Sequence, residues 1–324
     1  MKKTFTLKLF AILCCTTLFT FSCKNDPSDL GLAPASSAKF KELRTQALKD
    51  LTQTASFKAE EGISFTSDKG TLLTIGPDCL QDDENNTVTG DVTLSFIEIY
   101  DRGNMVATNK PVMGKDGEGN LLPLVTGGQY NLEIKQDNKR LKSRCTFHVN
   151  IPTALTGGVD DEMILWKGEI NEEGNLVWED AGQRNGNVGP DDKGTSYNVW
   201  EGEFGWTNVD RFYNDPRPKT QIKVTVPSGY SNENSGVFLA YEGEPNVLAQ
   251  LDVYNTADNY FTEHYGFIPI GMNLHVIFVS ESNGYVVYHI KKVTIAANAT
   301  IAISSDDLNT TTKNNLVSMI NALN

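Results

Sequence analysis

The sequence predicts an all-β protein of two tandem β-sandwich domains, with a short N-terminal helix and a short C-terminal helix. Apolar residues recur at every second position through much of the chain after residue 54, which is the period of a half-buried strand. Clusters of Gly, Asn, Asp and Pro separate these runs as turns do. A chain of 324 residues suggests two domains, because single hydrophobic cores stop growing at about 250–300 residues.

Residues 1–22 have the layout of a secretory signal peptide. Lys2 and Lys3 precede an apolar run over residues 9–21, and the small residue Ser22 follows it. The run is 13 residues long, whereas a membrane-spanning helix needs about 20. We therefore expect a cleaved signal rather than a single-pass anchor.

The residues that follow the apolar run indicate lipidation. Thr20-Phe21-Ser22-Cys23 resembles a bacterial lipobox, although Thr20 stands where that motif usually has leucine. The resemblance implies that Cys23 is the lipid attachment site and that residues 23–35 form a lipidated tether. An ordinary cleaved signal with an incidental cysteine is the alternative. Several acyl chains would hold the protein stably on a membrane, so we expect an outer-membrane lipoprotein that faces the periplasm or the cell surface.

A short helix is expected over residues 36–53. Ser36 or Ser37 can serve as its N-cap. The apolar side chains that follow recur at helical spacing and form one stripe: Phe40, Leu43, Ala47, Leu48 and Leu51. This stripe predicts that one side of the helix packs against the body of the protein or that the helix acts as a stalk.

Residues 54–152 are expected to form the first β-sandwich. The clearest strand is residues 141–151, whose two faces alternate. Its inward face carries Leu141, Ser143, Cys145, Phe147, Val149 and Ile151, and its solvent face carries Lys142, Arg144, Thr146, His148 and Asn150. Pro152 and the Gly157-Gly158 pair predict a domain boundary near residues 153–160.

The first domain also carries a family-like pattern. A glycine-threonine start, alternating apolar residues and a proline turn precede a small residue, a leucine and a glycine-led strand. These are Gly70-Thr71, Leu73, Ile75, Pro77, Cys79-Leu80 and Gly90-Asp91-Val92. The pattern, over residues 57–152, is similar to the ZU-type β-sandwich of ankyrins and netrin receptors. With the lipobox and residues 205–212, the chain looks like outer-membrane lipoproteins of Bacteroidetes-type bacteria, which implies a fold and a compartment but no chemistry.

Residues 160–324 are expected to form the second β-sandwich, which ends in the C-terminal helix. Residues 171–174 and 282–284 have the composition of hairpin turns, and residues 180–194 lack periodicity and are expected to form a long exposed loop. Ser305 can cap the final helix. The apolar side of that helix is expected to carry Leu308, Thr312, Leu316, Met319 and Leu323.

Two cysteines besides Cys23 remain after signal cleavage. If Cys23 is acylated, Cys79 and Cys145 form an even pair within one domain of an exported protein, where disulfides persist. Cys145 points inward by strand phase, and Cys79 occupies a position at which the ZU-type pattern has a small buried residue. Two alternatives stay open: a Cys79–Cys145 disulfide, or two buried thiols that act as small apolar groups.

The sequence carries no recognised catalytic or metal-binding motif. It lacks a Gly-x-Ser-x-Gly elbow, a His-Glu-x-x-His helix and a phosphate-binding glycine loop. The four histidines, at positions 148, 264, 275 and 289, share no short spacing, whereas a zinc site needs three or four converging ligands. Residues 82–86 and 116–120 have calcium-like acidic spacing, but turn chemistry explains both segments better. We therefore predict no catalytic residue, metal or cofactor.

The segment from Trp200 to Trp206 is the most aromatic in the chain. Strict alternation would place Trp200, Phe204 and Trp206 on one face, with Glu201 and Glu203 on the other. A strand that alternates aromatic and acidic residues normally turns its aromatic side chains inward. The pattern predicts that both tryptophans belong to the core rather than to a sugar-binding platform.

These observations favour a non-enzymatic cell-envelope lipoprotein that acts as a binding or scaffold module. Its expected partners are the membrane, through the N-terminal lipid anchor, and an unknown envelope protein or glycan. A net charge of -13 argues against nucleic acid. The alternative is a surface lipoprotein that binds a glycan or a host protein, and the third hypothesis is a hydrolase with an unrecognised site. A glycan binder should expose several aromatic side chains, whereas a hydrolase should gather carboxylates in a cleft.

Overall fold

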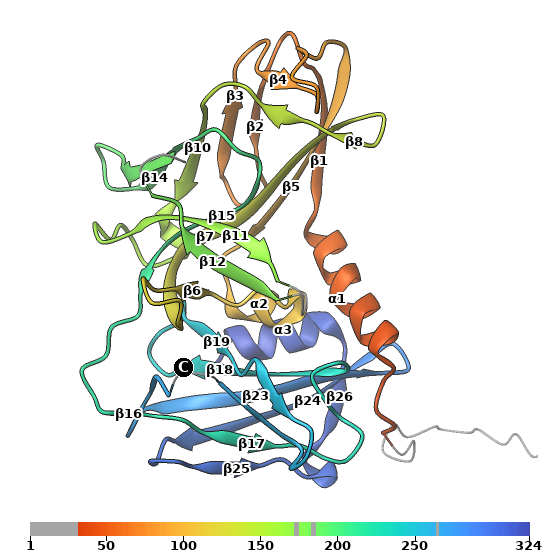
Figure 1. Cartoon of the computed structure of the whole chain (residues 1–324), viewed down its shortest axis with the longest axis vertical. Helices are drawn as coiled ribbons and strands as arrows, with labels where there is room; N and C mark the ends of the chain where they lie inside the picture. Colours follow the sequence, from red (N-terminus) through yellow and green to blue (C-terminus); the bar gives the residue numbers. More distant parts are fainter. Residues whose placement is uncertain (1–31, 172–174, 183–185, 264–265) are drawn as a thin grey trace, which may run out of the picture. The chain divides into compact units, whose positions relative to one another are not determined.

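The structure, a computed structural model, describes residues 32–171, 175–182, 186–263 and 266–324 (Figure 1). Strands predominate in these ranges, which contain three α-helices, so the predicted all-β class is confirmed. The signal peptide and Cys23 lie outside the described residues. No helix within the described ranges is both long enough and apolar enough to span a bilayer.

The N-terminal helix is α1 (Ser37–Leu51), within the range that the sequence predicts. Ser36 is its N-cap, and the Ser36 hydroxyl accepts a hydrogen bond from the Lys39 amide at 3.3 Å. Phe40 and Ala47 are buried on the face toward the protein. The apolar stripe therefore packs as expected.

The C-terminal helix α3 (Lys313–Asn321) begins later than the sequence predicts. Ser305 does not cap it, because Ser305–Asp307 forms a single 3-10 turn that Ser304 and Asp307 close reciprocally. The chain then extends as β26 (Asn309–Thr311), which pairs with β24 (Tyr285–Thr294). The β-branched threonines of this segment favour a strand, and Thr312 is the N-cap of α3.

Two sheets contain most of the strands up to residue 212. The larger has the order β1-β5-β7-β15-β11-β12-β6 with β8 paired to β7, and the smaller has the order β13-β14-β10-β3-β2. The larger sheet comprises β1 (Gln53–Lys58), β5 (Asp91–Ile99), β6 (Met113–Lys115), β7 (Leu121–Gln136), β8 (Lys139–Arg140), β11 (Ile164–Ile170), β12 (Leu176–Asp180) and β15 (Gly205–Phe212). The smaller comprises β2 (Ile63–Thr66), β3 (Leu72–Ile75), β10 (Phe147–Pro152), β13 (Gly186–Pro190) and β14 (Ser196–Glu201). The two sheets share one core, which includes Leu94, Leu132, Val149 and Val199.

The predicted boundary at residues 153–160 does not separate these sheets. Across this segment β10 pairs with β14, and β7 pairs with β15. Strands up to residue 212 therefore complete the first pair of sheets, and the expected division into residues 54–152 and 160–324 is wrong in position. The proline and glycines of this segment mark a turn within the sheets, where Thr153–Leu155 forms a 3-10 turn.

Two further segments differ from the expected local structure. The strand predicted over residues 141–151 is interrupted at residues 144–146, so that β9 (Lys142–Ser143) pairs with β4 (Leu80–Gln81), whereas β10 pairs with β3 and β14. The loop predicted over residues 180–194 contains β13. Because β13 is rich in glycine and lies at the edge of its sheet, it carries little apolar periodicity.

The strands after residue 212 form a second group of sheets. A five-stranded sheet has the order β19-β18-β23-β24-β26, a four-stranded sheet has the order β20-β21-β17-β25, and β16 pairs with β22. The strands not yet named are β16 (Lys219–Thr220), β17 (Lys223–Thr225), β18 (Ser235–Tyr241), β19 (Leu248–Gln250), β20 (Val253–Asn255), β21 (Tyr260–Thr262), β22 (Ile268–Pro269), β23 (Asn273–Ser282) and β25 (Thr300–Ala302). Val224, Val237, Val276 and Phe278 belong to their common core.

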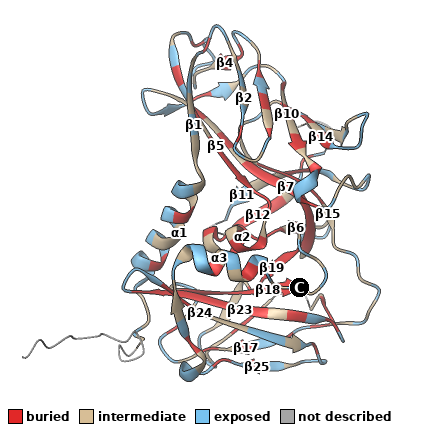
Figure 2. Cartoon of the chain, turned by 180° about the vertical axis from the view of Figure 1, so that it is seen from behind, coloured by how far each residue is buried: buried red, intermediate tan, exposed pale blue. Residues whose placement is uncertain are grey.

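A third core joins the helices to both groups of sheets. It includes Phe40 of α1, Trp166 of β11, Ile277 of β23 and Leu316 of α3. A helix that the sequence did not predict, α2 (Arg102–Thr108), contributes Met105 and Val106 and contacts α1 and α3. Figure 2 shows buried residues along α2 and along β5, β7 and β23. The two groups of sheets are thus connected by a shared hydrophobic core.

Candidate functional site

The outer face of the smaller sheet carries the most site-like group of side chains in the described residues. In antiparallel pairs, residues directly opposite each other project to the same side of the sheet. One row of opposed residues crosses all five strands and contains Asn187, Trp200, His148, Thr74 and Ser64. Next to it, Asn150 of β10 lies opposite Asn198 of β14. We call Trp200, His148, Asn150, Asn198, Asn187 and Thr74 the Trp200 face.

Trp200 is exposed, which contradicts the prediction that it belongs to the core. Its exposed fraction is 50%, and its ring stacks on the His148 ring with centroids 4.3 Å apart and an interplanar angle of 30°. Tyr197 and Val199 of the same strand are buried, so Trp200 must point outward. The alternation of residues 197–200 was the sequence signal for this orientation.

The error arises because the alternation does not continue from residue 200 to residue 206. β14 ends at Glu201 and β15 begins at Gly205, with the intervening residues outside any strand. Trp206 is partly buried, packs against the third core and lies edge-on to Trp178 at 6.4 Å. The two tryptophans therefore have different environments: Trp206 packs against the core and Trp200 does not.

Polar side chains beside Trp200 are held by hydrogen bonds between β10 and β14. Asn198 Oδ1 lies 2.9 Å from His148 Nε2 and accepts a hydrogen bond from Asn150 Nδ2 at 3.1 Å. Asn150 Nδ2 also donates to Ser196 Oγ at 2.6 Å. Amide side chains present donors and acceptors together. The Trp200 face thus combines an exposed aromatic ring with amide groups fixed on a rigid sheet.

The residue next to Trp200 is anchored on the opposite side of the sheet. The Glu201 side chain is 1% exposed and forms an ion pair with Lys167. Its carboxylate also accepts hydrogen bonds from the Tyr130 hydroxyl and from Thr207 Oγ1, the latter at 3.0 Å. Burial and the charge of Glu201 raise the pKa of Tyr130 well above its usual value, so that hydroxyl stays protonated and donates. This network fixes the end of β14 that carries Trp200.

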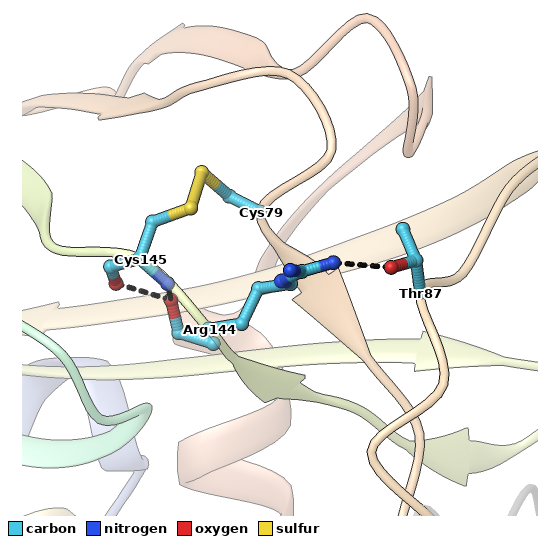
Figure 3. Close-up of a disulfide and its surroundings, with 5 residues drawn as sticks. Cys79, Thr87, Arg144 and Cys145 are labelled. Carbon is cyan, nitrogen blue, oxygen red and sulfur yellow. Dashed lines mark hydrogen bonds between the residues drawn. A yellow bond between two sulfur atoms is a disulfide. The ribbon is translucent and has the colours of Figure 1, made fainter.

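Cys79 and Cys145 are joined by a disulfide, with their Cα atoms 5.2 Å apart (Figure 3). Arg144, the residue before Cys145, also contacts the segment that contains Cys79. Its amide donates a hydrogen bond to the Cys79 carbonyl at 3.0 Å, and its guanidinium donates to Thr87 Oγ1. The disulfide lies where the chain turns between β9 and β10. It therefore fixes the start of the strand that carries His148 and Asn150.

The remaining sequence candidates do not converge. His264 lies outside the described residues, and His275 and His289 lie on β23 and β24, away from the sheet that carries His148. No group of three or more His, Cys, Asp or Glu side chains in the described ranges could hold a metal ion.

The two acidic segments at residues 82–86 and 116–120 form hydrogen-bonded turns. Asp82 Oδ1 accepts from the amides of Glu84 and Asn86, at 2.9 and 2.8 Å. Asp116 Oδ1 accepts at the same distances from the amides two and four residues later. Hydrogen bonds lower the pKa of both carboxyl groups: the backbone amide of Asn86 contributes most at Asp82, and the side-chain amide of Asn120 contributes most at Asp116. They account for the two aspartates as turn residues.

No family model matches the chain, and no curated protein is significantly similar to it.

Proposed function

We propose that the protein is a non-enzymatic binding lipoprotein of the cell envelope, that Cys23 carries its lipid, and that the Trp200 face binds a glycan. The observation that carries the proposal is the half-exposed Trp200 ring between fixed amide groups on an open sheet face. The lipobox-like residues support a place in the cell envelope, and so does the disulfide, because disulfides persist in proteins exported from the cytosol. The two groups of sheets, which we interpret as tandem β-sandwiches, would present this face on a rigid body.

The chemistry of the Trp200 face suits a neutral saccharide. A sugar ring offers C–H groups that can cover an indole ring, and its hydroxyls can exchange hydrogen bonds with Asn198, Asn150 and Asn187. Trp200 already makes one stacking contact, with His148, which fixes its orientation and lowers the entropy that binding would cost. A glycan is also an ordinary component of a bacterial envelope, so this function agrees with the binding role expected from the sequence.

A hydrolase fits the described residues less well. The deeply buried carboxylates are Glu98, Glu201 and Asp210, which are at most 3% exposed. Glu98 accepts hydrogen bonds from Ser67 Oγ and Thr71 Oγ1, at 2.8 and 2.9 Å, and Glu201 is paired with Lys167. Burial raises the pKa of Asp210 well above its usual value. Glu98 and Glu201 are engaged by these partners and Asp210 is fully buried, whereas a catalytic carboxylate must reach the substrate.

A glycan array probed with the wild-type protein and with Trp200→Ala tests the proposal. We expect saccharides that bind the wild type to lose most of their signal with Trp200→Ala. Tyr285→Ala is the matched control, because Tyr285 is an aromatic residue of similar exposure, 54%, on β24. Equal signals from all three proteins, or no wild-type signal for any envelope saccharide, would contradict glycan binding at this face.

A further inference from the structure

A cavity apart from the Trp200 face is lined by three positively charged side chains, of which Lys41 is exposed and Arg44 and Lys110 are the more buried. Arg44 of α1 and Lys110, just after α2, line this cavity of about 540 Å³ together with Thr108, Asn109 and Asn232. Pockets that bind small molecules commonly enclose about 300–1,000 Å³. The cavity is on the helices and a loop near β18, whereas the Trp200 face is on the smaller sheet, so the two features are independent.

Both cations are desolvated by their surroundings. The exposed fraction of Lys110 is 6%, and the hydrogen bond of its Nζ, to the Asn109 carbonyl, is long at 3.4 Å. The Nζ also lies 5.7 Å from the centre of the Trp206 ring. Arg44 lies over the Phe40 ring at 4.0 Å, and its Nε is buried without a hydrogen-bond partner. Burial lowers the pKa of Lys110 to about 8, to which the charge of Arg44 contributes, and lowers that of Arg44 to about 9.

No carboxylate compensates these charges. Neither Arg44 nor Lys110 forms an ion pair within the described parts of the chain, and the charge that acts on Lys110 is the repulsive one of Arg44. Glu233 also lines the cavity, but its side chain is exposed and bonds neither cation. A buried Lys110 and a partly buried Arg44, two like charges without a counter-ion, are unfavourable. An anion between them would offset the repulsion between the two charges. It would also accept the hydrogen bond that the Nε of Arg44 lacks.

We propose that this cavity binds the phosphate group of a ligand between Arg44 and Lys110. A guanidinium presents a planar set of donors that matches phosphate oxygens, and an ammonium adds a compact charge. The apolar side chains of Phe40 and Leu48 line the same cavity, so it can also accommodate an uncharged part of the ligand. The phosphate could belong to a soluble metabolite or to a lipid headgroup, which the test separates.

The first experiment measures binding of inorganic phosphate by calorimetry and thermal unfolding, with chloride at equal ionic strength as the reference. The proteins are wild type, Lys110→Met, Arg44→Gln and Lys49→Met. We expect phosphate to raise the wild-type Tm, and each of the first two substitutions to weaken binding by about tenfold or more, because each removes a charge-assisted hydrogen bond. Lys49→Met is the control, since Lys49 is an exposed lysine of α1 that does not line the cavity, and this variant should bind like wild type.

Stability without phosphate separates a folding defect from lost binding. Lys110→Met removes an uncompensated buried charge, so this variant should be at least as stable as wild type in chloride. If Lys110→Met does not fold, phosphate binding by Arg44→Gln is compared with that of the wild type instead. The proposal is overturned if phosphate and chloride stabilise the wild type equally, or if both variants bind phosphate as the wild type does.

A second experiment, with lipid vesicles, identifies whether the phosphate group belongs to a lipid or to a soluble ligand. Two proteins that cannot be acylated at position 23, Cys23→Ser and the double variant Cys23→Ser/Lys110→Met, are each mixed with phosphatidylglycerol or phosphatidylcholine vesicles. Lys110-dependent binding to either vesicle indicates a lipid headgroup. Binding of inorganic phosphate with no Lys110-dependent vesicle binding indicates a soluble ligand.

Discussion

Trp200 and Glu201 are adjacent in the sequence but lie on opposite faces of β14. The outward ring is supported by His148, whereas the inward carboxylate is held by Lys167, Tyr130 and Thr207. Glu201 is therefore the residue through which the core fixes the position of its exposed neighbour. A buried charge can have this role only while its partner is present.

Lys167→Met should destabilise the protein by about 3–5 kcal/mol, because it leaves Glu201 charged and buried without its ion-pair partner. Urea unfolding measures the change. The double variant Lys167→Met/Glu201→Gln should recover much of the loss, since no buried charge remains. Lys39→Met is the control: Lys39 and Glu42 form an exposed pair, with side chains 64% and 68% exposed, and such pairs contribute about 0–1 kcal/mol. Equal effects of Lys167→Met and Lys39→Met would contradict the assigned role of Glu201.

Cys23→Ser tests the lipid anchor. Labelled palmitate should enter the wild-type protein during growth and should not enter the variant, because the variant lacks the thiol that receives the lipid. Cys79→Ser is the matched control, since Cys79 is engaged in the disulfide and should not affect labelling. Equal incorporation into wild type and Cys23→Ser would show that Cys23 is not the attachment site.

At the scale of elements, the disulfide connects two turns that flank the smaller sheet. It joins residues 66 positions apart, and closing a loop of that size stabilises a folded protein by about 4 kcal/mol in the chain-entropy description. The double variant Cys79→Ser/Cys145→Ser should therefore unfold at a lower urea concentration than the wild type. Its free energy of unfolding should be lower by about 2–5 kcal/mol. Thiol titration of mature protein in denaturant without reductant should find neither cysteine free. Two free thiols would exclude the disulfide.

Elements with a strong single periodicity could be predicted from the sequence. The stripe on residues 36–53 predicts α1, and the inward phase of Phe147, Val149 and Ile151 is confirmed in β10. Elements whose identity depends on tertiary contacts could not be predicted. The short helix α2 takes its stability from the third core, and β13 pairs along an edge without apolar alternation of its own.

The candidate site was harder to predict than the fold because it depends on strand ends. The residues of the Trp200 face lie on four strands, β3, β10, β13 and β14, that come together only through pairing. A single break in β phase, between Glu201 and Gly205, reversed the expected environment of Trp200. The disulfide partners, in contrast, could be named as a pair because Cys79 and Cys145 were the remaining even pair.

At the scale of the whole molecule, the third core predicts that the two groups of sheets unfold together. All four tryptophans, at positions 166, 178, 200 and 206, lie in the first group. Tryptophan fluorescence therefore reports on the first group, whereas far-UV circular dichroism reports on both. We expect the two urea transitions to coincide. Two separate midpoints would show that the shared core of α1, α2, α3 and the sheets does not couple them.

The central claim is that the exposed Trp200 ring contributes to ligand binding and not to stability. The most direct measurement is calorimetric titration of the best array saccharide into wild type and Trp200→Ala, with unfolding curves for both. The account predicts affinity at least about tenfold weaker for Trp200→Ala, with a free energy of unfolding within about 0.5 kcal/mol of wild type. Unchanged affinity, or a large loss of stability, would contradict it.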